Sequence, residues 1–354
     1  MFYKDIVVIL VIVIILFVFE QYLVNQRFGH LKVNKSKILK KSTTKSTTKS
    51  TTKSTTKSTS KIKYSTLPDD AVEFRDCDVP CYYDNRIPLV GIKTVYDHLG
   101  RYSTFMHTME GPKHYPKSLD KGTYDGLSTV SMKSDIPLPY FSHAEYDIFS
   151  VSPVDYNNSI KGISFIARNC YSLNKREKLV EEIQKYLRVD SLSSCLNNAP
   201  WPSTFKRSNK HGVMRQYLFY FALENECSND YITEKLWGAL AAGVVPVYYG
   251  APNVLEYVPD HSIIDVHKFK DTVTGEIDYE GLGGFLNYVA NDRGAYMKYH
   301  EWRTKKNKYA RFLKTYEFTN VHSLCRACRW NWARHEPKKY RFDNKTQKLQ
   351  LQSF

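Results

Sequence analysis

The chain has 354 residues, of which 42% are hydrophobic and 25% charged, and its formal net charge is +15. This length suffices for two domains of ordinary size, and the composition is that of a globular protein. Most of the excess charge lies in residues 25–63, which contain Arg27 and eleven lysines but no acid, so that residues 64–354 carry only +4. The folded part therefore lacks the clustered basic surface of a nucleic-acid-binding domain, and we expect no nucleic acid among its partners.

The first residues are expected to anchor the chain in a membrane. An unbroken run of 14 apolar residues spans positions 6–19. We interpret residues 6–24 as a signal-anchor transmembrane helix that follows a cytoplasmic tail of residues 1–5. No small-residue cleavage site follows the run, which favours an anchor over a cleaved signal peptide. The many lysines after the run oppose this topology, because positive charge normally stays on the cytoplasmic side.

Residues 25–66 are expected to form a low-complexity stem. Residues 41–56 repeat Lys-Ser-Thr-Thr four times, and a tract without apolar side chains cannot offset its ordering entropy and should stay disordered. Three Asn-x-Ser/Thr sequons, at Asn34, Asn157 and Asn344, are candidates for N-glycosylation. Together with the cysteine content they favour a lumenal body, which predicts a single-pass type II protein of the Golgi membrane, with the endoplasmic reticulum as the alternative.

The body is expected to be an α/β protein. Residues 67–158 mix Gly, Pro and aromatic residues with short apolar segments, and their best strand candidates are residues 103–109 and 147–151. Strands and helices then alternate. Strands are predicted at 162–167, 217–223, 244–249 and 262–266, and helices at 175–187, 232–242, 283–290 and 296–316. Such alternation predicts a parallel sheet.

The most informative stretch, residues 217–250, reads as a strand–helix–strand unit. In such units ligands bind at the carboxyl ends of the strands. A polar group falls at that edge and consists of Glu224, Asn225, Asn229, Asp230, Tyr231, Glu234 and Lys235. The helix start and Lys235 offer positive charge to an anion, and Glu234 offers a carboxylate to sugar hydroxyls. By spacing alone, a surface helix with an ordinary Glu-Lys pair explains these residues equally well.

The same stretch resembles the α1,3-fucosyltransferases, whose shared motif has the form F-x-x-x-x-E-N…D-Y-x-T-E-K…P-V-x-x-G. The matching residues are Phe219, Glu224-Asn225, Asp230-Tyr231, Thr233-Glu234-Lys235, Pro246-Val247 and Gly250. The resemblance implies two Rossmann-like lobes of the GT-B type. Residues 67–158 would form the acceptor-side lobe, and residues 159–305 the lobe that binds GDP-fucose, the donor substrate. Residues 306–354 would pack back on the first lobe.

The resemblance also implies a set of donor-binding residues. They are Asn169, Arg176, Tyr220, Asn225, Tyr231, Glu234 and Lys235. Arg176 and Lys235 would bind the diphosphate. On position alone, Arg176 reads as a solvated helix-end charge and Tyr220 as a core residue. Arg168 stands where the family has a serine.

The general base is expected on the first lobe. Met109-Glu110-Gly111 resembles the family's Met-Glu-Ser motif, with glycine in place of serine, and makes Glu110 the candidate base. His114 is a second candidate. The scheme needs no metal, and no Asp-x-Asp triplet is present to hold one. Stimulation by Mn²⁺ stays open.

The seven cysteines fall into three groups, namely Cys77 and Cys81, Cys325 and Cys328, and Cys170, Cys195 and Cys227. The first two groups have zinc-ligand spacing, so a four-cysteine zinc site is one hypothesis. A lumenal chain would instead oxidise them to disulfides. The family's C-terminal Cys-x-x-Cys implies disulfides between these two groups. In the third group we expect a disulfide between Cys170 and Cys195 and a free thiol at Cys227.

Three further stretches, residues 77–81, 134–148 and 322–328, resemble the plant-type core α1,3-fucosyltransferases. This resemblance implies inverting transfer of L-fucose to the Asn-linked core GlcNAc of N-glycans, on a glycoprotein acceptor. A Lewis-type or protein O-fucosylating enzyme would share the donor residues, and a non-catalytic, membrane-anchored glycan-binding protein would share the fold. The chain departs from the family pattern in the short segment between Cys81 and Glu110, at Arg168, and at residues 192–194.

Overall fold

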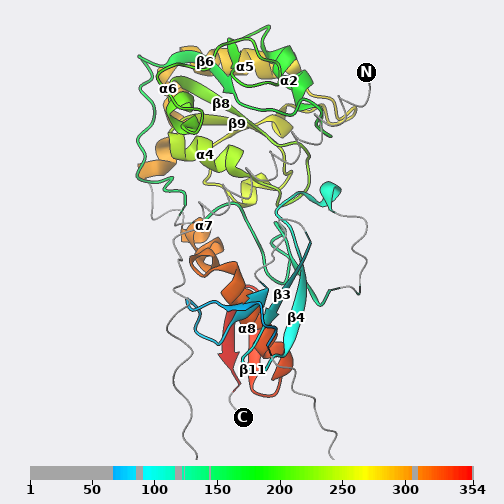
Figure 1. Cartoon of the computed structure of the whole chain (residues 1–354). Helices are drawn as coiled ribbons and strands as arrows, with labels where there is room; N and C mark the ends of the chain where they lie inside the picture. The colour runs from blue at the N-terminus through cyan, green and yellow to red at the C-terminus, as the bar shows by residue number, and fades with distance from the viewer. Residues whose placement is uncertain are drawn as a thin grey trace, which may run out of the picture. The chain divides into compact units, whose positions relative to one another are not determined.

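The computed structural model describes residues 67–352, with the exception of residues 85–90, 116–121, 123, 143–144 and 305–309. All elements given below belong to one compact unit, which lies within Ile62–Phe354 (Figure 1). The expected tail, anchor and stem, with Asn34, lie outside the described residues. Within the described ranges, no helix is long and apolar enough to span a membrane.

A five-stranded parallel sheet with the order β10-β9-β8-β6-β7 forms the larger core. Its strands are β6 (Ile160–Phe165), β7 (Val189–Ser191), β8 (Tyr217–Leu223), β9 (Val245–Tyr249) and β10 (Ile264–Asp265). All seven residues of β8 are buried, as expected of a parallel strand that is covered on both faces. This sheet confirms the α/β class that the alternation of strands and helices predicted.

Helices cover this sheet on both sides. They are α2 (Arg176–Ile183), α3 (Lys210–Met214), α4 (Glu234–Ala242), α5 (Tyr279–Asn291) and α6 (Arg293–Lys298). Helix α4 packs on β8 and β9, whereas α5 packs on β6 and on α2. In Figure 1 the strands β6, β8 and β9 lie between α4 and the pair α2 and α5. The strand–helix–strand unit predicted at 217–250 is therefore β8, α4 and β9.

Two residues fix the ends of α4. At the start, the Thr233 hydroxyl oxygen accepts a hydrogen bond from the backbone N–H of Lys235. At the end, Gly243 has a φ of 77°, in the left-handed region that favours glycine. A Cβ at Gly243 would also lie 2.4 Å from the backbone oxygen of Ser152, so that both the backbone conformation and the space require glycine here.

The first sheet differs from the expected Rossmann-like lobe. Its strands are β1 (Ala71–Glu73), β2 (Tyr82–Asp84), β3 (Gly91–Tyr96), β4 (Tyr102–His107) and β5 (Gly126–Ser128), in that order. Each neighbouring pair is antiparallel except β4 and β5. The reason is local: β3 and β4 are joined by a short turn in which the Asp97 carboxylate accepts hydrogen bonds from the backbone N–H groups of Leu99 and Arg101. A connection this short cannot join parallel strands.

Two local predictions also need correction. Residues 147–151 form no strand, because the Asp147 side chain accepts hydrogen bonds from Ser150 and closes a turn. The helix predicted at 296–316 is interrupted. Part of it belongs to α6, and beyond α6 the described residues contain the short η4 (Glu301–Thr304) and α7 (Ala310–Thr315). The other short 3₁₀ turns are η1 (Pro112–His114), η2 (Val254–Glu256), η3 (Val266–Phe269) and η6 (Glu317–Asn320).

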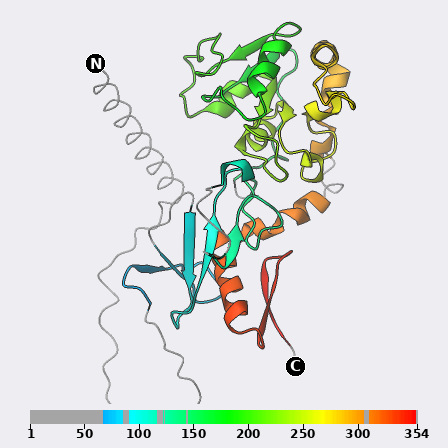
Figure 2. The same ribbon diagram turned by 90° about the vertical axis from the view of Figure 1, so that its right-hand side faces the viewer.

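The C-terminal segment completes the core of the first sheet. Helix α8 (Ser323–His335) packs on β3, and an antiparallel hairpin of β11 (Tyr340–Asp343) and β12 (Lys348–Leu351) packs on α8 (Figures 1 and 2). Leu324 and Ala327 from α8 join Val95, Phe105 and Ile136 in one buried cluster. The first sheet therefore depends on residues from both ends of the described chain.

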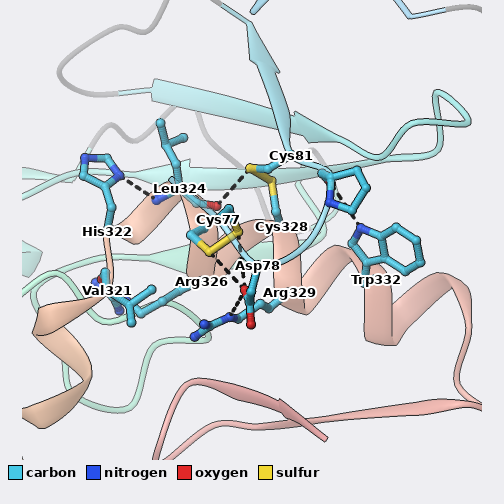
Figure 3. The surroundings of a disulfide bond; sticks show 12 residues. Cys77, Asp78, Cys81, Val321, His322, Leu324, Arg326, Cys328, Arg329 and Trp332 are labelled. Atoms are coloured by element: carbon cyan, nitrogen blue, oxygen red, sulfur yellow. Dashed lines mark hydrogen bonds and ion pairs between the residues drawn. A yellow bond between two sulfur atoms is a disulfide. The ribbon is translucent and has the colours of Figure 1, made fainter. Parts of the chain in front are cut away.

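Two disulfides join the same parts. Cys77 is bonded to Cys325 and Cys81 to Cys328, with sequence separations of 248 and 247 residues (Figure 3). These bonds take the place of the four-cysteine zinc site that spacing alone allowed. Asp78, between the two N-terminal cysteines, accepts a hydrogen bond from Arg329 Nε at 2.8 Å, which adds an ion pair to the covalent links.

Candidate functional site

The candidate site lies at the carboxyl ends of β8 and β9, and Glu224 is its buried centre. Its Oε1 accepts a hydrogen bond from the backbone N–H of Thr233 at 2.7 Å, and its Oε2 accepts one from the Thr233 hydroxyl at 2.8 Å. Burial raises the pKa of Glu224, and the Lys235 ammonium, 3.3 Å from Oε2, opposes this shift. Gly250 leaves room for this carboxylate, because a Cβ there would lie 2.5 Å from Glu224 Cγ.

Lys235 links two carboxylates. Besides Glu224, its Nζ lies 3.5 Å from Glu234 Oε1 and donates a hydrogen bond to the Thr233 hydroxyl oxygen at 2.9 Å. Burial lowers the pKa of Lys235, but Glu224 and Glu234 outweigh it and raise the pKa overall. Burial likewise raises the pKa of Glu234, but the Lys235 ammonium, Lys210 and hydrogen bonds to Glu234 together outweigh burial, so this pKa is lowered. The side chains of Lys235 and Glu234 remain 22% and 43% exposed, so both can reach a ligand.

Arg176 is buried, unlike the solvated helix-end charge that its position allowed. Its Nη1 donates to the backbone oxygen of Leu223 at 2.7 Å, and its Nη2 donates to that of Asn169 at 3.0 Å. The guanidinium thus joins the ends of β8 and β6. Of its five N–H donors, at least two are used on carbonyl groups, and Nε is buried with no hydrogen-bond partner in the described part of the chain.

Asn169 lies in the loop after β6 and helps to position Arg176. Its side-chain oxygen accepts a hydrogen bond from the backbone N–H of Tyr171 at 2.8 Å, while its backbone holds Arg176. The next residue, Cys170, forms a disulfide with Cys195, which fixes the loop after β6 to the loop after β7. The departures from the family pattern lie in the same place, since the Ser194 hydroxyl donates to the backbone oxygen of Arg168 at 3.1 Å.

Two tyrosines line the site from the core. Tyr220 on β8 is 3% exposed and belongs to the large core, and burial and the nearby Glu234 raise its pKa. Tyr231 is also buried, and burial together with Glu224 raises its pKa. Its hydroxyl donates a hydrogen bond to Glu110 Oε2 at 3.4 Å. Tyr220 is therefore a core residue, as its position in a central strand suggested. It also lies close enough to Glu234, Arg176 and Glu224 for their charges to act on its pKa.

Several buried polar atoms gather here without a hydrogen-bond partner among the described residues. They are Arg176 Nε, Asn174 Oδ1 and Asn225 Oδ1. Buried polar groups are almost always paired, so such a group of unpaired donors and acceptors indicates a polar ligand. Asn174, whose Nδ2 donates to the backbone oxygen of Glu224 at 3.0 Å, was missed in the sequence. Its position just before Arg176 was the available signal.

Glu110 lies in an exposed position after β4. Its backbone N–H donates to the Thr108 hydroxyl oxygen at 3.0 Å, and the Tyr231 hydroxyl reaches its carboxylate. His114, in η1, lies 3.4 Å from Asn225 Nδ2 through its Nε2. The structure therefore brings the candidate base and the second candidate, His114, to the loop that leads into α4.

Asp230 joins the loop that leads into α4 to the segments around Ser131 and Asn253. No pattern in the sequence indicated this structural role. Its φ of 67° is in the left-handed region. Its Oδ2 accepts hydrogen bonds from the Ser131 hydroxyl and the Met132 N–H, both at 3.0 Å, and its Oδ1 accepts one from Asn253 at 2.9 Å and one from Tyr257 at 2.8 Å. The Asp230 carboxylate thus accepts four hydrogen bonds from the protein, which indicates that Asp230 holds the surrounding loops in place and does not contact a ligand.

The remaining predicted residues lie apart from this site. The candidate glycosylation residues Asn157 and Asn344 are exposed, which a glycan acceptor requires. Cys227, the free cysteine, is half-buried beside Asn174.

Together these residues offer two cations, a helix start, buried acceptors and two carboxylates at one edge of a parallel sheet. Such an arrangement is typical of α/β proteins that bind an anionic ligand at the carboxyl ends of their strands. The family model described as glycosyltransferase family 10 (fucosyltransferase), C-terminal part, matches residues 157–348, which is more than half of the chain. The chain belongs to this family, and the family resemblance seen in the sequence is confirmed.

Named relatives agree with this assignment. The chain is 30% identical over 231 residues to a fucosyltransferase-like protein of Arabidopsis thaliana, covering 64% of this chain and 42% of the relative. It is 29% identical over 234 residues to GDP-fucose protein O-fucosyltransferase 3 of Danio rerio, covering 64% and 45%. It is 31% identical over 214 residues to the Rattus norvegicus protein of that name, covering 55% and 43%. The chain thus spans less than half the length of these relatives.

A solved structure of an α1,3-fucosyltransferase with GDP-fucose aligns with 42% of this chain and 40% of its own chain, at 23% identity and a TM-score of 0.36.

Proposed function

We propose that this protein transfers L-fucose from GDP-fucose to an acceptor hydroxyl, with inversion at C1 of the sugar. The observation that carries the proposal is the presence of two cations, buried Arg176 and Lys235 at the start of α4, on the carboxyl edge of the parallel sheet, where Arg176 is close enough for its charge to oppose the rise in the pKa of Lys235. Two cations and the positive dipole end of α4 suit a diphosphate leaving group. Family membership and the names of the relatives support the choice of donor.

The proposed reaction assigns a role to each group. The acceptor oxygen forms a bond to C1 of fucose while the bond from C1 to the β-phosphate oxygen breaks, and GDP leaves with the electron pair. Glu110 accepts the proton of the acceptor hydroxyl. Arg176 and Lys235 stabilise the charge that develops on GDP, and Glu234 faces the positive charge that develops on the sugar. The two cations fill the role that a divalent ion fills in other transferases, and Mn²⁺ enters this proposal only as a stimulating ion.

For the acceptor, we propose the Asn-linked core GlcNAc of N-glycans, linked α1,3. The support is the resemblance of residues 77–81, 134–148 and 322–328 to the plant-type core enzymes. A second candidate is transfer to a protein hydroxyl, which the names of the Danio rerio and Rattus norvegicus relatives favour. Both reactions use the same donor site, so that only the acceptor distinguishes them.

The test is a transfer assay on the full chain purified in detergent. The protein is incubated with GDP-fucose and either N-glycopeptides or folded, unglycosylated proteins, and mass spectrometry locates the added fucose. Fucose on the innermost GlcNAc supports the first acceptor, and fucose on Ser or Thr supports the second. Loss of transfer in Glu110→Gln supports the role of the base. Glycan binding without GDP release would refute the proposed reaction and favour a glycan-binding protein.

We further propose that the protein is a single-pass type II protein of the Golgi membrane with a lumenal body. The predicted anchor and the exposed sequons at Asn157 and Asn344 support this topology. Glycosidase-sensitive mass on both asparagines, together with protease protection in sealed vesicles, is the expected result. An unglycosylated body that protease digests would contradict it.

A further inference from the structure

Glu226 is a buried carboxylate that the proposed mechanism does not use. It lies two residues after Glu224, its side chain is 0% exposed, and neither of its carboxylate oxygens has a hydrogen-bond partner among the described residues. Burial of a carboxylate without donors is costly. Because this burial destabilises the fold, we expect Glu226 to have a function that involves the groups around its side chain.

The first group it meets is Gly111. A Cβ on Gly111 would lie 2.1 Å from Glu226 Oε1 and 2.4 Å from its Cδ. The backbone of Gly111 has a φ of −70° and a ψ of 156°, a conformation open to any residue. A larger residue at position 111 would therefore require the Glu226 side chain to move, because that side chain fills the space beside Gly111.

The second group is His114. Its Nε2 lies 3.7 Å from Glu226 Oε2, and the His114 side chain is 37% exposed. When the imidazole is protonated, this contact is an ion pair. The same Nε2 lies 3.4 Å from Asn225 Nδ2. Glu226 and Asn225 thus meet one side chain from adjacent positions in the loop after β8.

Both groups belong to the segment that carries Glu110. Gly111 follows Glu110 directly, and His114 ends the single turn η1. A backbone hydrogen bond also joins these two residues, from the His114 N–H to the Gly111 oxygen at 2.9 Å. Fixing these two residues therefore fixes the backbone on one side of Glu110, while Thr108 fixes it on the other.

We propose that Glu226 is a positioning residue for Glu110. It packs against Gly111 and faces His114, and it thereby holds the 108–115 segment so that the Glu110 carboxylate stays beside Tyr231 at the donor site. The role of Glu110 rests on the proposed function. The pairing also explains the departure from the family's Met-Glu-Ser motif, because a serine at position 111 would collide with a glutamate at position 226.

The test is a double-mutant cycle on the full chain, with Gly111→Ser, Glu226→Ser and the double variant. Gly111→Ser drives its side chain into Glu226, and Glu226→Ser removes the support, so each lowers kcat by at least about tenfold, as expected for a base displaced by about 1 Å. The KM for GDP-fucose should change less than kcat, because neither substitution replaces a donor-binding residue. In the double variant the collision is relieved, and kcat rises above that of Gly111→Ser.

Glu226→Gln is the conservative variant. It keeps the shape that Gly111 requires and removes the charge that faces His114, so kcat should fall less than in Glu226→Ser. A kcat equal to that of the unchanged chain in both Glu226 variants would overturn the proposal. Strictly additive losses in the cycle would also overturn it, since they would show that Gly111 and Glu226 do not interact.

Hydrogen–deuterium exchange of residues 108–115 gives a second readout that needs no activity. Faster exchange confined to this segment in Glu226→Ser is expected, and unchanged exchange would contradict the proposal. If the unchanged chain transfers no fucose, the proposed function fails, but the exchange result still decides whether Glu226 holds the segment. Global loss of protection would indicate misfolding of Glu226→Ser, in which case Glu226→Gln decides.

Discussion

Arg176 offers the sharpest test of the donor site. The guanidinium donates to the backbone oxygens of Leu223 and Asn169 at 2.7 and 3.0 Å, and hydrogen bonds from charged donors contribute about 1.5–3 kcal/mol each. Arg176→Lys keeps the charge, but a single ammonium cannot span both carbonyls while its remaining donors face a ligand. We expect the free energy of unfolding to fall by about 2 kcal/mol, which lowers the Tm by roughly 4–8 °C.

The same change should weaken GDP binding. Loss of a planar, bidentate contact to phosphate is expected to cost about tenfold to a hundredfold in Kd, and each tenfold corresponds to about 1.4 kcal/mol. Isothermal titration calorimetry with GDP measures the Kd, and thermal melts with and without GDP measure the stability.

Arg188→Lys is the matched control for Arg176→Lys. Arg188 pairs with Asp190 at 2.7 Å, but its side chain is 60% exposed, so both quantities should stay close to those of the unchanged chain. If Arg176→Lys bound GDP within about twofold of the unchanged chain, the guanidinium would not contact the nucleotide and the assignment of the diphosphate site would be wrong.

Three further outcomes follow from the structure. Gly250→Ala forces a Cβ toward Glu224 and should destabilise the protein by about 1–3 kcal/mol in chemical unfolding, whereas an unchanged midpoint would show that the loop yields freely. Because Lys235 holds the pKa of Glu234 below its usual range, the ionised Glu234 stabilises the fold above about pH 5, and this contribution is lost as the pH falls through the lower native pKa. Glu234→Gln should therefore flatten the loss of stability between about pH 5 and 3, and parallel curves would contradict this. Reduction of the long-range disulfides removes a constraint worth about 5 kcal/mol for a loop of 248 residues, and a Tm that is insensitive to reductant would refute it.

The sequence predicts best where local chemistry and burial agree. The all-apolar run of β8, the Thr233 cap and the glycine at position 243 set the elements of the strand–helix–strand unit without any tertiary information. The polar edge of that unit followed from topology alone. The first sheet was harder, because its strands are short and interrupted and its core is completed by α8, more than 200 residues later in the chain.

Roles that depend on burial could not be read from the sequence. At the start of a helix, Arg176 reads as a solvated charge, and only the fold shows that it is buried and bonded to backbone oxygens at the end of β8 and in the loop after β6. Disulfides between the group of Cys77 and Cys81 and the group of Cys325 and Cys328 were expected from the resemblance alone, and only the structure shows which cysteine pairs with which. Glu226 was missed because a glutamate in a polar loop has no distinguishing pattern, although a glycine in place of serine at position 111 was a usable clue.

The disulfides between Cys77 and Cys325 and between Cys81 and Cys328 show that the first sheet and its cover come from two distant segments of the chain, with the residues of the parallel sheet between them. During synthesis at about 5–20 residues per second, the N-terminal segment must wait on the order of 10 to 50 s for its C-terminal partner. The parallel sheet can therefore fold first. Until α8 emerges, Val95, Phe105 and Ile136 lack the apolar residues that cover them, and oxidation of the wrong cysteine pairs competes with correct assembly.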